Sequence, residues 1–98
     1  MIADTPNVSS TIVARRLVRN CGATTDDVTE IYLSKKHGEI EGTEPVFRAD
    51  KLSNLSLEWD DDATLILRYD RARIFHFRSF WYEADSDTTV QVRIQGGA

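Results

Sequence analysis

The stretch 68–82 holds the residue types best suited to binding another molecule. It combines four arginines with six aromatic side chains: Arg68, Arg71, Arg73, Arg78, Tyr69, Phe75, Phe77, Phe80, Trp81 and Tyr82. Arginine with tryptophan and tyrosine is typical of the hot spots of protein interfaces. Arginine also pairs with phosphate while aromatic rings stack on bases, as in proteins that bind single-stranded nucleic acid. A third interpretation is structural: an aromatic core whose rim carries arginine stems.

The charge of the chain favours a protein partner over nucleic acid. The 98 residues have a formal net charge of −4, and acidic runs lie at 58–62 and 83–87, close to the arginines. This balance opposes non-specific binding to nucleic acid or to an anionic membrane. We therefore expect a protein partner, with nucleic acid as the alternative, and a binding site formed by Arg71, Arg73, Phe75, His76, Arg78, Trp81 and Tyr82.

One cysteine and two histidines are the candidates for catalysis. A thiolate and imidazole pair of Cys21 with His37 or His76 would suit nucleophilic catalysis. Nothing in the sequence brings these residues together, and a lone cysteine beside a turn glycine is more often a small packed residue. We expect no catalytic residues, and a small enzyme that uses Cys21 stays an alternative.

Three consecutive aspartates raise the question of a metal site. Asp60, Asp61 and Asp62, with Glu58, offer the oxygen ligands that hard cations prefer. Calcium loops place their ligands at alternating positions around a turn glycine, which this run does not have. The aspartates are also good turn formers, and a single cysteine excludes a four-cysteine zinc site. We expect neither a metal nor a cofactor.

The elements that must position the binding stretch begin with a β-hairpin over residues 52–70. Apolar residues recur there with the period of two that marks strands with one buried face. The residues predicted for that face are Leu55, Leu57, Trp59, Leu65, Leu67 and Tyr69. A two-residue turn at Asp61 and Asp62 would send Leu65 and Leu67 to the other face, so we expect a three-residue loop.

The rest of the chain reads mostly as strands. Further strands are predicted at 28–34, 46–49 and 88–95. Residues 11–19 are ambiguous: Ser10 could cap a short helix near residues 11–20, whereas the β-branched residues from Thr11 to Val13 favour a strand. Residues 1–9 are expected to form a flexible arm, and residues 96–98 a disordered tail.

Several short strings resemble a known group of proteins. They are RNCGATT at 19–25, VFRAD at 46–50, WDDDATLILRY at 59–69 and ARIF at 72–75. Together they look like a group of small uncharacterised bacterial β-domains, whose members often follow a signal or lipoprotein segment. The resemblance covers about residues 12–95 and implies a strand at 11–19 and an all-β meander. It implies no activity, and the chain as given lacks the export segment.

These observations predict one all-β domain over residues 10–95. We expect an antiparallel meander of about six strands, sandwich-like or a half-open barrel. Either 88–95 or 11–19 is expected at a sheet edge, which a second copy would cover in a homodimer. Without a motif of nucleophile and base, a phosphate-binding glycine loop or a metal-ligand cluster, the prediction is a non-catalytic protein-binding or interaction module.

The N-terminal residues and the apolar pattern bear on location. The chain shows no basic start followed by an apolar run, and no apolar stretch approaches the roughly 20 residues of a membrane span. We expect no membrane insertion. The expected location is cytoplasmic for the chain as given, or extracytoplasmic if an export segment is missing.

Overall fold

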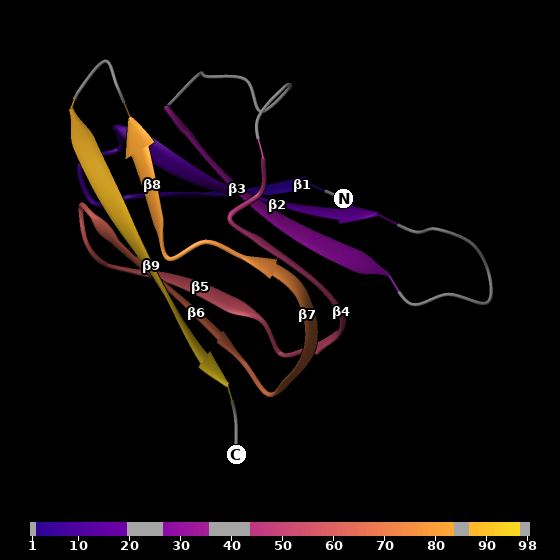
Figure 1. Ribbon diagram of the computed structural model, residues 1–98. Coiled ribbons are helices and arrows are strands. Elements are labelled where there is room, and N and C mark those ends of the chain that lie inside the picture. The colour runs from indigo at the N-terminus through magenta and orange to yellow at the C-terminus, as the bar shows by residue number, and fades with distance from the viewer. Residues whose placement is uncertain (1, 20–26, 36–43, 84–86, 97–98) are drawn as a thin grey trace.

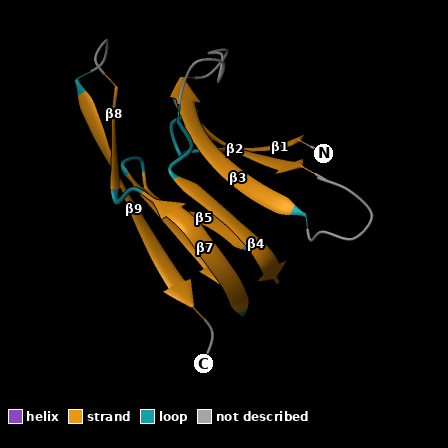
Figure 2. Ribbon diagram, turned by 45° about the vertical axis from the view of Figure 1, so that its right-hand side comes forward, coloured by secondary structure: helices purple, strands orange, loops and turns teal. Residues whose placement is uncertain are grey.

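The computed structural model describes residues 2–19, 27–35, 44–83 and 87–96, and these form strands without a helix. Two sheets face each other as an open sandwich (Figures 1 and 2). The five-stranded sheet has the order β1-β2-β3-β4-β7 and the four-stranded sheet the order β5-β6-β9-β8. The strands are β1 (Ile2–Pro6), β2 (Ile12–Arg19), β3 (Val28–Lys35), β4 (Phe47–Ser53), β5 (Ser56–Asp61), β6 (Thr64–Tyr69), β7 (Arg71–Phe77), β8 (Phe80–Glu83) and β9 (Thr88–Gly96).

The predicted all-β class and sandwich-like form are confirmed, and several details differ. Nine strands are described rather than about six, because bends divide long extended stretches between the two sheets. The helix alternative for residues 11–20 is wrong, since β2 pairs with β3 over its whole length, from Ile12↔Lys35 to Arg19↔Val28. Residues 1–9 are not simply an arm, because β1 pairs with β2 from Ile2 to Pro6.

One long bent hairpin connects the two sheets. Its near half pairs β4 with β7 in the five-stranded sheet, and its far half pairs β5 with β6 in the four-stranded sheet. The bend lies where the Asp70 amide donates to the Ser53 carbonyl at 2.9 Å. Asn54, at the same bend, has a φ of 55°, a conformation that asparagine tolerates better than most residues. Both strands therefore change sheet at one point.

The tip of this hairpin keeps the predicted face but reaches it differently. Leu57 pairs with Leu67 and Trp59 with Leu65, so the expected side chains do share the inner face. The loop is a two-residue turn at Asp62 and Ala63, preceded by a register shift between Trp59 and Asp61. The bulge adds one residue to the first strand, which keeps Leu65 and Leu67 on the same face as Leu57 and Trp59. A two-residue turn plus a bulge therefore replaces the expected three-residue loop.

The order of strands departs from a meander at β9. This strand runs parallel to β6, from Thr64↔Gln91 to Tyr69↔Gly96, and lies between β6 and β8. The edges are β1 and β7 in one sheet and β5 and β8 in the other. The expectation that 88–95 or 11–19 forms an edge is therefore wrong, because both β9 and β2 have neighbours on each side.

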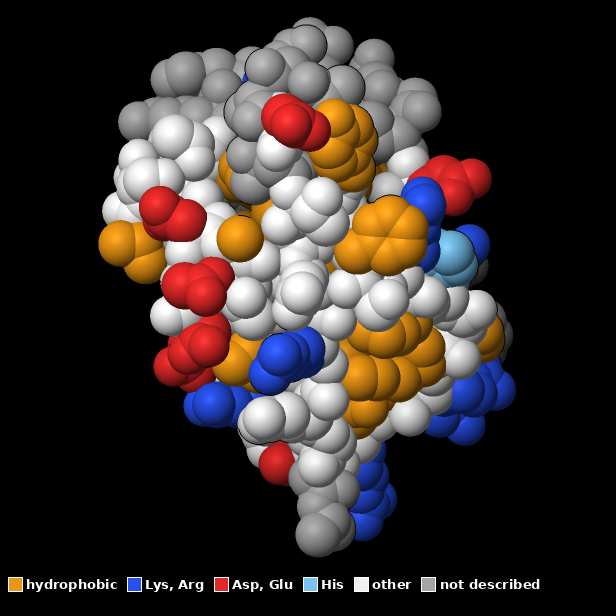
Figure 3. Space-filling view, turned by 60° about the vertical axis from the view of Figure 1, so that its left-hand side comes forward, with side chains coloured by type: hydrophobic (Ala, Val, Ile, Leu, Met, Phe, Trp, Pro, Cys, Tyr) orange, Lys and Arg blue, Asp and Glu red, His pale blue; other side chains and the backbone are white. Residues whose placement is uncertain are grey.

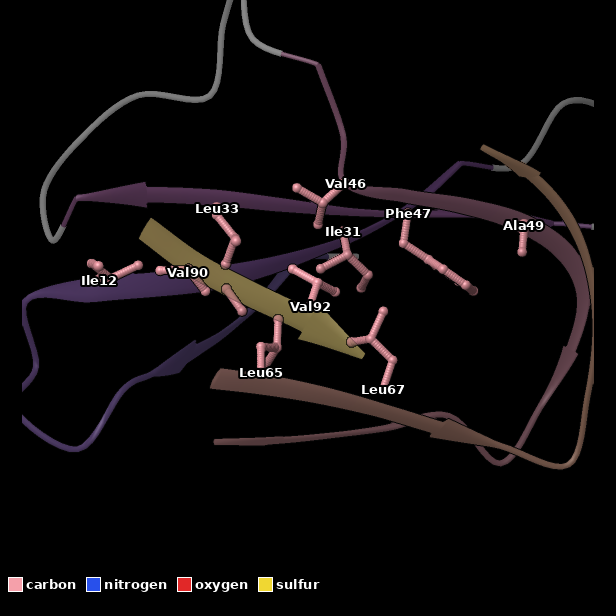
Figure 4. Close-up of a cluster of buried hydrophobic side chains, with 11 residues drawn as sticks. Ile12, Ile31, Leu33, Val46, Phe47, Ala49, Leu65, Leu67, Val90 and Val92 are labelled. Atoms are coloured by element: carbon pink, nitrogen blue, oxygen red, sulfur yellow. The ribbon is translucent and has the colours of Figure 1, made fainter. Parts of the chain in front are cut away.

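The core fills the space between the sheets (Figure 4). Apolar side chains from β2, β3 and β4 meet those of β6 and β9, and burying them is the main favourable contribution to folding. The cluster consists of Ile12, Ala14, Ile31, Leu33, Val46, Phe47, Ala49, Leu65, Leu67, Val90 and Val92. No helix of the described residues is long and apolar enough to cross a membrane.

Candidate protein-binding surface

β7 and β8 are consecutive strands that occupy the free edges of different sheets. The chain crosses between the sheets at Arg78 and Ser79. The Arg78 amide donates to the Val46 carbonyl of the first sheet at 2.7 Å, and the Ser79 carbonyl accepts from the Val92 amide of the second at 2.8 Å. Two edge strands of different sheets are thus joined end to end by a two-residue crossover.

These two strands carry most of the exposed large hydrophobic side chains of the described residues. Ile74 is 37% exposed, Phe75 52%, Phe80 51% and Tyr82 51%, and the fifth such residue is Val8, far from them in the sequence. We call Arg71, Arg73, Phe75, Arg78, Phe80 and Tyr82 the β7–β8 surface; Ile74 lies on the opposite face of β7, paired with the buried Ala49. Figure 3 shows hydrophobic side chains gathered on this side of the molecule, with arginines near them. Exposed apolar groups gathered in this way mark interaction sites.

Two arginines lie over two of the exposed rings. The guanidinium carbon of Arg73 is 5.1 Å from the centre of the Phe75 ring, and that of Arg78 is 5.7 Å from the centre of the Phe80 ring. Each arginine precedes its phenylalanine by two residues, and for Arg73 and Phe75, both in β7, this spacing places the side chains on one face of the strand. The cation–π contact orients the ring and the charge together.

The arginines of the stretch 68–82 mostly have acidic partners. Arg68 contacts Glu58 at 2.7 Å and Arg78 contacts Glu44 at 3.7 Å. Arg73 donates two hydrogen bonds to Asp50, including one from Nε to Oδ1 at 2.8 Å. These hydrogen bonds from the Arg73 guanidinium hold the pKa of the Asp50 carboxyl below its ordinary value. Much of the positive charge is therefore already balanced within the chain.

The Asp50–Arg73 pair predicts a measurable pH effect. A carboxyl whose pKa is lowered in the folded state stabilises the protein above the ordinary value of 3.8, and this contribution is lost as the pH falls through the folded-state pKa. We expect Arg73→Ala to raise the Asp50 pKa, as followed by NMR titration of its carboxyl carbon. Arg71→Ala, on the same strand, is the control and should leave it unchanged; equal shifts in both variants would contradict the pairing.

The structure separates the predicted site residues into three groups. Arg71, Arg73, Phe75, Arg78 and Tyr82 lie on the β7–β8 surface, and the Tyr82 hydroxyl donates to Asp87 at 2.7 Å. Trp81 instead packs against the core from the inner face of β8. His76 pairs with Arg48 in the five-stranded sheet, and its Nε2 is buried without a hydrogen-bond partner among the described residues. Phe80, which is 51% exposed, was absent from the predicted binding residues, although it lies in the same aromatic stretch beside Trp81.

The described residues give no support to the catalytic or the metal alternative. Cys21 and His37 lie outside them, so their separation from His76 is not defined. In the ranges 2–19, 27–35, 44–83 and 87–96, no three His, Cys, Asp or Glu residues are grouped so that they could hold a metal ion. At the aspartate turn, Asp61 Oδ1 accepts from the Ala63 amide at 2.8 Å and Asp62 Oδ1 from the Ser9 amide at 2.7 Å. These two carboxylates hold backbone in place.

Fold and surface together define a class: a small open β-sandwich with an aromatic and arginine-lined pair of edge strands. Comparisons of the chain with protein-family models, with curated proteins and with solved structures find no match.

Proposed function

We propose that this protein is a non-catalytic protein-binding module whose partner docks on the β7–β8 surface. The observation that carries the proposal is the half-exposure of Phe75, Phe80 and Tyr82 on two consecutive edge strands, one at the free edge of each sheet. Aromatic side chains contribute large contact areas at a small loss of conformational entropy, which is why they dominate interface energetics. Exposing these rings to water is unfavourable in free energy, and a partner that covers them removes that apolar surface from water.

The charges favour a protein over nucleic acid as the partner. Proteins bind a phosphate backbone with free cationic side chains, which replace the counterions of the nucleic acid. Arg68, Arg73 and Arg78 each already contact a carboxylate of this chain, so their charge is largely neutralised. The net charge of −4 adds a repulsive field. A protein partner does not require free cations. The arginines, which lie over the rings and are paired with carboxylates, can form the polar rim of an interface whose centre is apolar.

Affinity capture with surface variants tests the proposal. We expect the double variant Phe75→Ser with Phe80→Ser to retain less than about a tenth of a partner captured by the unchanged protein from the source cell, because it removes two central anchors. Val8→Ser is the matched control: Val8 is 75% exposed but lies outside the β7–β8 surface. Circular dichroism must show that all variants are folded.

The proposal fails if captured proteins are the same for the unchanged protein and the folded double variant. It also fails if Val8→Ser abolishes capture as fully as the double variant does, because the loss would then not depend on the β7–β8 surface.

A further inference from the structure

β9 has a strand beside it along only half of one side. On the β6 side it is paired as far as Gly96. On the β8 side the pairing runs from Glu83↔Thr88 to Phe80↔Gln91, and the Val92 amide makes one more bond, to the Ser79 carbonyl. At Ser79 the chain turns away toward β7. From Arg93 to Gly96, therefore, no described strand lies on that side.

The backbone groups that face this free side can be identified. The Gln91 amide donates to the Ala63 carbonyl, just before β6, so odd-numbered residues of β9 direct their backbone toward β6. The Val92 amide donates to Ser79 on the other side, so even-numbered residues direct theirs away from β6. By this alternation the amide and carbonyl of Ile94 and the amide of Gly96 point to the free side. Such groups are a template for another strand.

The surroundings of the free half suit a strand that has one apolar and one acidic face. Ile94 and Phe77 are only partly buried against the core, and Ile74 is 37% exposed. A surface hollow of about 340 Å³ lies along the paired part of β8 and β9, lined by Ser79, Phe80, Thr89, Gln91 and Val92, and reaches the free half only at Arg93. Figure 3 shows hydrophobic side chains on this side between arginines. Arg93 is exposed and lies between Val92 and Ile94, which face the core, so its side chain points outward from the four-stranded sheet; no ion pair of the described side chains involves it.

We propose that Arg93–Gly96 binds an extended segment of a partner protein, in which apolar and acidic residues alternate, antiparallel to β9 and in line with β8. Main-chain bonds to Ile94 and Gly96 hold the segment, its apolar side chains cover Ile94, and an acidic side chain meets Arg93. This inference rests on the proposed function and names the chemistry of its partner. Symmetric pairing of two copies through the same segment would instead bring two Arg93 side chains onto one face, and their repulsion disfavours it.

Hydrogen exchange with a synthetic peptide tests the inference. The probe is an acetylated and amidated Val-Asp repeat of eight residues, and its composition control has four valines followed by four aspartates. In the free protein, NMR should show faster exchange at the Ile94 amide than at the Arg93 and Gln95 amides, which face β6. The alternating peptide should slow exchange at Ile94 and Gly96 at least about fivefold and leave Arg93 and Gln95 nearly unchanged.

Charge variants and a methylated probe complete the test. Arg93→Glu should weaken binding of the alternating peptide roughly tenfold, because an attraction becomes a repulsion. Lys51→Glu makes the same charge change on β4 and should have little effect. A peptide N-methylated at every second residue, which removes its donors toward β9, should not bind.

Four results would overturn the inference. In the free protein, the Ile94 amide could be as protected from exchange as that of Arg93, or light scattering could show a dimer in which Ile94 is protected. With peptides, the block peptide or the methylated peptide could bind as tightly as the alternating one. If the peptide fails while partner capture still depends on Phe75 and Phe80, strand addition is wrong and the proposed function stands. If capture does not depend on those rings while the peptide protects Ile94, the β7–β8 surface is the part that is wrong.

Discussion

Phe47→Ala is expected to lower the free energy of unfolding by about 3–5 kcal/mol, the usual cost of emptying a phenylalanine site in a core. Phe47 has no exposed surface and is among the largest fully buried side chains of the described residues. Its ring centre is 6.3 Å from that of Tyr69, which lies on the facing sheet. The substitution therefore removes contacts between the two sheets as well as apolar burial. Urea unfolding followed by tryptophan fluorescence measures the change.

Phe80→Ala is the matched control for this prediction. It removes the same atoms from a ring that is 51% exposed, so the loss should stay within about 1 kcal/mol. Similar losses in the two variants would mean that Phe47 does not hold the sheets together in solution.

Asn7→Ala is expected to cost about 2–4 kcal/mol, because it leaves several buried polar groups without partners. Asn7 is only 3% exposed. Its Oδ1 accepts from the amides of Thr11 at 2.9 Å and Ile12 at 3.2 Å, and its Nδ2 donates to the Asp62 carbonyl at 3.0 Å. One side chain thus closes the β1–β2 turn and ties it to the tip of the long hairpin. Thermal and urea unfolding should both show the loss.

Ser9→Ala separates this effect from a general weakening of the turn. Ser9 lies in the same connection, but its side chain is exposed and bonds only to the Thr11 hydroxyl among the described residues. Its removal should change the free energy of unfolding by no more than about 0.5 kcal/mol. If both variants lose the same amount, the buried bonds of Asn7 are not the reason.

The hairpin face could be predicted from the sequence, whereas the choice between helix and strand for residues 11–19 could not. The hairpin face from Leu55 to Tyr69 shows a clean alternation, and the structure keeps it. In β2, the three consecutive residues Ile12, Val13 and Ala14 are all buried, so the period that separates strand from helix is blurred there. The strand at 28–34 was predicted, but its burial on both faces was not: in β3 every residue from Thr29 to Ser34 is buried, including Glu30, which accepts a hydrogen bond from Arg19.

The pairing of strands that lie far apart in the sequence could not be predicted either. No local pattern indicates that β9 passes between β6 and β8, because parallel pairing carries no turn signal. The composition of the stretch 68–82 drew attention to six aromatic residues, but the predicted site included Trp81, which packs against the core, and left out the exposed Phe80. Which of them are exposed depends on the register shift between β4 and β7 near Arg48 and on the crossover at Ser79, and neither has a local signature.

The central position of β9 has a consequence for biosynthesis. Its neighbours β6 and β8 are translated earlier. Because β9 lies between them, nothing joins β6 to β8 in the sheet until β9 has been made. Since a chain leaves the ribosome from its N-terminus, one wall of the sandwich remains open until residue 96 has been released. In that interval Leu65 and Leu67 lack the cover of Val90 and Val92, and apolar side chains exposed in this way favour aggregation of the nascent chain.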